Sequence, residues 1–138
     1  MKAAAVRTVL LLGVLYCAVG ILFGILAGQA ASTEMRVAWR RAAWVVSGIA
    51  FGAHIVYDQV RLHGSPRLTA LRVSSAAALG AFGLAVAANI HARSVAPEQR
   101  SPILLLSLAI WPVMTGLPAF MVALVSAVFL DRARRRLD

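Results

Sequence analysis

Four long apolar segments constrain the fold of this chain more than any other feature of its sequence. Almost all of the charge lies between or beside them, and they cover Thr8–Gln29, Ala42–Val60, Leu68–Ala92 and Ile103–Leu130. Each exceeds the roughly 18 residues that a helix needs to cross a hydrocarbon core about 30 Å thick. Inside a bilayer, a chain without the alternating pattern of a barrel must pair its backbone groups within helices. The sequence therefore predicts an all-α integral membrane protein with four transmembrane helices.

The connections between these segments are short. They run around Ser32–Arg41, Arg61–Arg67 and Arg93–Pro102, which leaves no room for a soluble domain. Short links make consecutive helices antiparallel neighbours. We therefore expect residues 1–138 to form a single transmembrane domain, a four-helix bundle.

The positions of the Lys and Arg residues predict the orientation of the bundle. With a cytoplasmic N-terminus, nine of the 14 basic residues lie on the cytoplasmic side and five on the other. The positive-inside rule then favours both ends in the cytoplasm. We expect the protein to reside in the cytoplasmic membrane of a bacterium.

The first segment has an alternative interpretation as a cleaved signal peptide. Lys2 and Arg7 precede it, and small residues at Gly28-Gln29-Ala30 would suit cleavage. Its apolar run of 22 residues is, however, longer than the usual signal-peptide core of about 7–15 residues. A retained membrane helix is therefore favoured.

The net charge of +9 would point to nucleic acid in a soluble protein. Here the arginines flank apolar segments, so we expect no nucleic-acid partner. The basic run after the last segment consists of Arg132, Arg134, Arg135 and Arg136. Next to a membrane, such a run attracts anionic lipid headgroups with about 1 kcal/mol per Arg. A simpler role for this run is to keep the C-terminus on the cytoplasmic side. In both interpretations the arginines contact the lipid bilayer.

Small residues recur at helical spacing in all four segments. In the first segment they share one face, formed by Gly13, Cys17, Gly20, Gly24 and Gly28. Gly48 and Gly52 repeat the pattern in the second segment. Such residues let helices approach closely in lipid. We expect them to pack inside the bundle, with a homo-oligomer or a membrane partner as the alternative, and Cys17 to be a small buried apolar residue.

The second segment carries a polar stripe. Its members fall on one face of a helix about 80° wide, and they are Ser47, Phe51, His54, Asp58 and Arg61, with Tyr57 adjoining. Titratable groups inside a membrane are costly and are usually paired or functional. Asp58 and Arg72 are both seven residues from Ser65 in the next turn, which predicts an ion pair between the two helices. His54 is expected either to hydrogen-bond a carbonyl or Ser75, or to relay protons or contact a substrate.

The fourth segment contains Pro112, Thr115, Gly116 and Pro118 near its middle. Proline removes a backbone donor and bends a helix. One interpretation is an ordinary kink, and the other is a broken helix whose freed carbonyls line a midplane site beside His54. Near the far end of the third segment, Asn89 and His91 are expected at headgroup depth, where polar residues need no special role.

Two functions fit this pattern. One is a small transporter or channel that uses the His54/Asp58 stripe, Thr115 and the helix-four break. The other is a non-catalytic accessory subunit that packs against a larger membrane protein. The sequence favours transport, although the stripe thins beyond Ser47. The sequence has no nucleophile, carboxylate pair or metal-ligand spacing that is typical of an enzyme. His54 and His91 are expected at different depths in the membrane, so they cannot both bind one haem iron. We expect no metal or cofactor.

Overall fold

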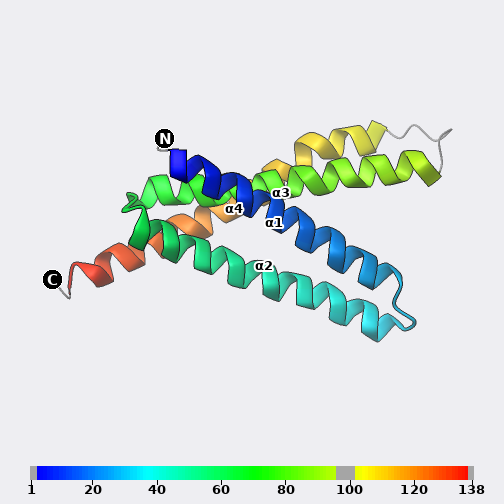
Figure 1. Ribbon diagram of the computed structural model, residues 1–138, viewed down its shortest axis with the longest axis horizontal. Coiled ribbons are helices and arrows are strands. Elements are labelled where there is room, and N and C mark those ends of the chain that lie inside the picture. Colours follow the sequence, from blue (N-terminus) through cyan, green and yellow to red (C-terminus); the bar gives the residue numbers. More distant parts are fainter. Residues whose placement is uncertain (1–2, 96–101, 137–138) are drawn as a thin grey trace.

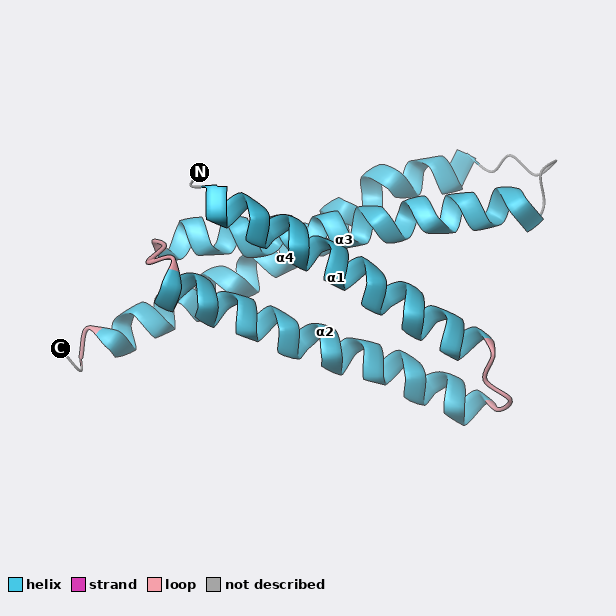
Figure 2. Ribbon diagram, viewed as in Figure 1, coloured by secondary structure: helices cyan, strands magenta, loops and turns pink. Residues whose placement is uncertain are grey.

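The computed structural model describes residues 3–95 and 102–136, and these form four α-helices joined by turns (Figure 2). Their bounds are α1 (Ala3–Gly28), α2 (Thr33–Arg61), α3 (Pro66–Val95) and α4 (Pro102–Arg134). The all-α prediction is confirmed, and each helix begins or ends several residues beyond its predicted apolar segment. Residues 96–101 of the third predicted connection lie outside the described part of the chain.

Three of the helices are long and apolar enough to cross a membrane, namely α1, α3 and α4. α2 is as long as the others, but its composition differs. Arg36, Arg40 and Arg41 lie in its first third, and His54 and Asp58 in its second half. The predicted transmembrane span at Ala42–Val60 therefore stays a prediction.

Local signals explain where α2 and α3 begin. Ser32 precedes α2 in an extended conformation, and its side chain accepts a hydrogen bond from the Met35 amide at 3.2 Å. This is the usual capping arrangement for the free amides at a helix start. α3 starts with Pro66, whose fixed φ and missing N–H suit the first helical position.

The helices form two antiparallel hairpins, α1–α2 and α3–α4 (Figure 1). The hairpins lie close together at the end that holds the α2–α3 turn and separate toward the end that holds the α1–α2 turn. The most extensive pairing is between α3 and α4, followed by α1 with α3. All the buried residues of α2 lie in its second half: His54, Ile55 and Asp58. The first half of α2 therefore lies apart from the α3–α4 hairpin.

Small residues bring α1 and α3 together. A Cβ atom added at Gly80 would lie 2.5 Å from the Tyr16 Cβ and 3.2 Å from the Gly13 carbonyl oxygen. At Gly83, it would lie 2.7 Å from the sulfur of Cys17, which is half-buried at this contact. Gly20 likewise packs against the Leu84 side chain. The predicted close packing of the first half of the glycine stripe is confirmed.

Four other glycines have no such neighbour. An added Cβ would meet no heavy atom within 4 Å at Gly24, Gly28, Gly48 or Gly52. The prediction that these positions pack inside the bundle is therefore wrong for the single chain.

α4 is one continuous α-helix through both of its prolines. The broken helix proposed at Pro112, Gly116 and Pro118 is therefore absent. Gly116 serves instead to bring α4 against α3, since its added Cβ would lie 3.3 Å from the Ala78 Cβ. The α4 residues that pack around Ile55 of α2 are Phe120, Ala123 and Leu124.

Candidate functional site

The α2–α3 turn is held by a buried ion pair. Asp58 is fully buried and Arg72 is 6% exposed. The Arg72 Nη1 donates to both carboxylate oxygens of Asp58, at 3.1 Å and 3.2 Å. The hairpin geometry predicted this pairing, because two residues equally far from a turn face each other across it.

A second donor completes the environment of the Asp58 carboxylate. The Thr69 hydroxyl donates to the Asp58 Oδ2 at 2.7 Å, and the Gln59 amide donates to the Thr69 hydroxyl at 3.1 Å. Sequence reasoning did not find Thr69 or Gln59. The available signal was that Thr69 precedes Arg72 by three residues, which places both on one face of α3. We call Asp58, Gln59, Thr69 and Arg72 the clamp.

The turn itself closes over the clamp. The amides of Leu62 and Gly64 both donate to the Asp58 main-chain carbonyl. Between them, His63 adopts a left-handed conformation with φ 47°. A Cβ added at Gly64 would lie 2.7 Å from the Asp58 Oδ2 and 2.8 Å from the Thr69 hydroxyl. Glycine is therefore the residue that lets this turn lie directly on the ion pair.

His54 lies one helical turn before Asp58 and is 2% exposed. Neither imidazole nitrogen has a hydrogen-bond partner among the described residues. The expected hydrogen bond to a carbonyl or to Ser75 is therefore wrong, and Ser75 is itself exposed. Buried polar atoms are almost always paired, so an imidazole with both nitrogens unpaired, one helical turn from a buried ion pair, is an unusual feature of this site.

The structure does not bring the other predicted site residues to the clamp. Tyr57 is 47% exposed, on the outside of α2. Ser47 and Thr115 are half-buried, and neither hydrogen-bonds to His54 among the described residues. Ser47 lies seven residues before His54, a rise of about 10 Å. The polar stripe of α2 is therefore two separate features rather than one continuous path.

A further polar contact joins α3 and α4. Asn89 is 7% exposed, and its Nδ2 donates to the carbonyl oxygens of Ala85 at 2.8 Å and Leu104 at 2.7 Å. Ser107 is also within hydrogen-bond distance of this amide. The expectation that Asn89 needs no special role is wrong, because it is a buried link between two helices. His91 is exposed, as a residue at a helix end.

The chemistry of the clamp is that of a structural contact. Its carboxylate already accepts from a guanidinium and a hydroxyl, so it has little capacity left for a substrate. No group of three or more His, Cys, Asp or Glu side chains among the described residues is arranged to hold a metal ion.

Comparison of the chain with protein-family models, with curated proteins and with solved structures found no match.

Proposed function

We propose that this chain is a membrane-embedded accessory protein, whose clamp holds its own helices and whose open glycine face on α2 receives a helix of a larger membrane protein. One observation carries the proposal. Gly48 and Gly52 form a Gly-x-x-x-Gly pair with no heavy atom within 4 Å of either added Cβ. In lipid, such pairs bring helices together through close backbone contact.

The remainder of the chain supports this interpretation. Gly13 and Gly20 of α1 and Gly80 and Gly83 of α3 are in close contact with neighbours, so glycines in this protein do act as packing surfaces. Large apolar side chains flank the open pair, with Ile49 at 68% and Val45 at 60% exposure. A partner helix on this face would cover glycine backbone and apolar side chains at the same time.

Gly48→Leu with Gly52→Leu is expected to release the partner while leaving the isolated chain folded. Both positions are exposed, and a Cβ added at either one meets no heavy atom within 4 Å, so we expect the helix content and the melting temperature to stay unchanged. The mass of the complex in mild detergent at native expression should fall from that of an assembly to that of the 14.6 kDa chain with its detergent.

The matched control is Ala53→Leu, which adds the same bulk to an exposed position about 100° further around α2. It should leave the assembly intact. A wild-type chain that already runs as a monomer contradicts the proposal, and so does an assembly that survives both glycine substitutions. If the assembly contains only copies of this chain, the glycine face of α2 binds a second copy rather than a larger membrane protein.

The same proposal includes a topology. We place α2 across the membrane beside the three apolar helices, with both chain ends in the cytoplasm, on the nine-to-five distribution of basic residues. After Cys17→Ala, a cysteine introduced by Ser94→Cys should react with an impermeant thiol reagent in intact cells. Labelling that requires cell lysis reverses the assignment.

Transport is the second candidate function, and the unpaired His54 favours it. Histidine is the side chain whose charge changes between pH 5 and 8. Its two free nitrogens beside Asp58 and Arg72 would suit a proton relay. In liposomes, wild-type protein should then carry a pH-dependent proton flux that His54→Gln abolishes. Equal flux from wild type, His54→Gln and empty vesicles would leave His54 as a packing residue.

A further inference from the structure

An open cavity of about 510 Å³ lies at the ends of α1 and α2 that the α1–α2 turn joins. α1 lines it with Phe23, Gly24 and Gly28, among others, and α2 with Arg36, Arg40 and Trp44. The α1 part of the wall is apolar, and the α2 part carries both of the charged groups. We call this space the wedge cavity.

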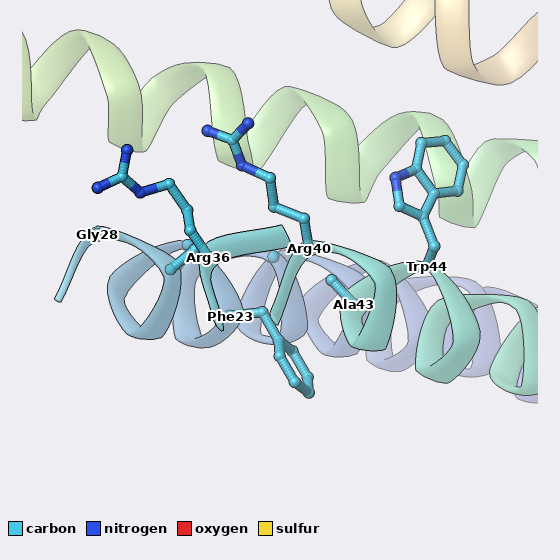
Figure 3. Close-up of a pocket in the computed structure, with 9 residues that line it drawn as sticks. Phe23, Gly28, Arg36, Arg40, Ala43 and Trp44 are labelled. Carbon is cyan, nitrogen blue, oxygen red and sulfur yellow. The ribbon is translucent and has the colours of Figure 1, made fainter. Parts of the chain in front are cut away.

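Three side chains of α2 are aligned along the wedge cavity. Arg36, Arg40 and Trp44 are spaced one helical turn apart and project from the same side of α2 (Figure 3). Both arginines are exposed, and neither has an ion-pair partner among the described residues. The adjacent Arg41 is also exposed but does not line the cavity.

The depth of these cations along the helices is that of lipid headgroups. The ring of Trp39, next to Arg40, lies 6.0 Å from the ring of Phe23. Phe23 precedes the end of the apolar helix α1 by five residues, or about 7.5 Å along its axis. Arg40 therefore starts near the end of a membrane-capable helix. In a bilayer this end lies at the boundary between the hydrocarbon core and the headgroups, because α1 is longer than the core is thick. An anionic headgroup at this level would pair with both cations.

We propose that the wedge cavity binds one anionic phospholipid, with its phosphate between Arg36 and Arg40 and an acyl chain along the α1 glycines. The guanidinium group suits a phosphate because it offers several donors in one plane. A Cβ added at Gly24 or Gly28 would meet no heavy atom within 4 Å, so open space for an acyl chain lies beside these glycines. The Trp44 ring lies beside the same opening, and tryptophan prefers the headgroup level.

Other occupants fit this cavity less well. A soluble phosphate would satisfy the arginines but leave the exposed Gly24 and Gly28 backbone of α1 uncovered. A second copy of the chain brings few acids, because among the described residues Asp58 belongs to the clamp and Asp131 bonds to Arg135, which leaves Glu34. Lipid binding in the wedge cavity requires that the protein is embedded in a membrane, but it does not require an accessory role. The two proposals can therefore fail separately.

Native mass spectrometry of protein purified in mild detergent from membranes that contain phosphatidylglycerol tests the proposal. The wild-type chain should retain one phospholipid, and so should Arg41→Gln, the adjacent exposed arginine outside the cavity. Arg36→Gln with Arg40→Gln should lower the lipid-bound fraction by about tenfold or more, because charge-assisted contacts are lost. An equal lipid-bound fraction in all three proteins would overturn the proposal.

Gly24→Leu tests the binding of the acyl chain in the wedge cavity separately from the binding of the phosphate by the arginines. A Cβ added at Gly24 meets no heavy atom within 4 Å and Gly24 lines the wedge cavity, so we expect the leucine side chain to occupy the cavity and displace the lipid while the fold stays intact. Lipid retention unchanged in Gly24→Leu shows that no acyl chain lies there and overturns the proposal. A second result would also overturn the proposal. The wild-type protein would retain no lipid but would bind inorganic phosphate, and this binding would depend on Arg36 and Arg40. The occupant would then be a soluble anion.

Discussion

Replacing Asp58 with asparagine is expected to destabilise the protein by about 3–5 kcal/mol, the usual cost of removing one partner of a buried ion pair. The substitution leaves the Arg72 guanidinium 6% exposed with no carboxylate beside it. Its Nε already lacks a partner, so the loss of Asp58 would leave the cation with little compensation. Denaturant unfolding in a fixed detergent, followed by the loss of helical circular dichroism, measures the change.

Two companion variants make this result specific. Asp58→Asn with Arg72→Gln removes both charges, and it should recover most of the lost stability. Asp131→Asn breaks the exposed pair with Arg135 on α4 and should cost about 0.5 kcal/mol or less. A single Asp58→Asn variant as stable as wild type would show that the clamp does not hold the hairpin.

Gly80→Leu is expected to have the other large effect. Even a Cβ at this position lies 2.5 Å from the Tyr16 Cβ and 3.2 Å from the Gly13 carbonyl oxygen, so a leucine forces α1 away from α3. Overpacking a well-filled contact typically costs about 1–3 kcal/mol. Here backbone lies on one side of the contact, so we expect at least the upper part of that range and a lower melting temperature in detergent.

Gly48→Leu is the matched control for this prediction. It places the same side chain at a glycine with no heavy atom within 4 Å, and the stability of the isolated chain should not change. If Gly80→Leu and Gly48→Leu had the same melting temperature, the close approach of α1 and α3 would be absent from the protein in solution.

The sequence predicted the features of this fold that depend on neighbouring residues. Apolar length placed the four helices, because a helix satisfies its own backbone wherever it packs. The Asp58–Arg72 pair followed from equal distances to one turn. Both inferences need only the local geometry of a helix or a hairpin, and a short connection fixes that geometry.

The features that sequence reasoning missed depend on how the helices pack against one another. Gly20 and Gly24 have the same spacing and the same residue type, yet one contacts Leu84 and the other faces open space. Asn89 looked like a surface residue by depth, but α4 lies against it and accepts its hydrogen bond through Leu104. Crossing angles arise from the sum of many side-chain contacts, so helical periodicity alone does not determine them.

The clamp also has a consequence for the order in which the chain enters a bilayer. α2 is the one described helix not apolar enough to qualify as a membrane span by length and composition, whereas α3 after it does qualify. Each charged residue at the centre of a helix adds about 2.5–3.5 kcal/mol to the cost of insertion. Asp58 and Arg72 are 14 residues apart, and closing so short a loop is fast and entropically cheap. In the topology proposed above, α2 and α3 would therefore enter as a pair whose charges already neutralise each other, and the apolar α3 would bring the more polar α2 with it.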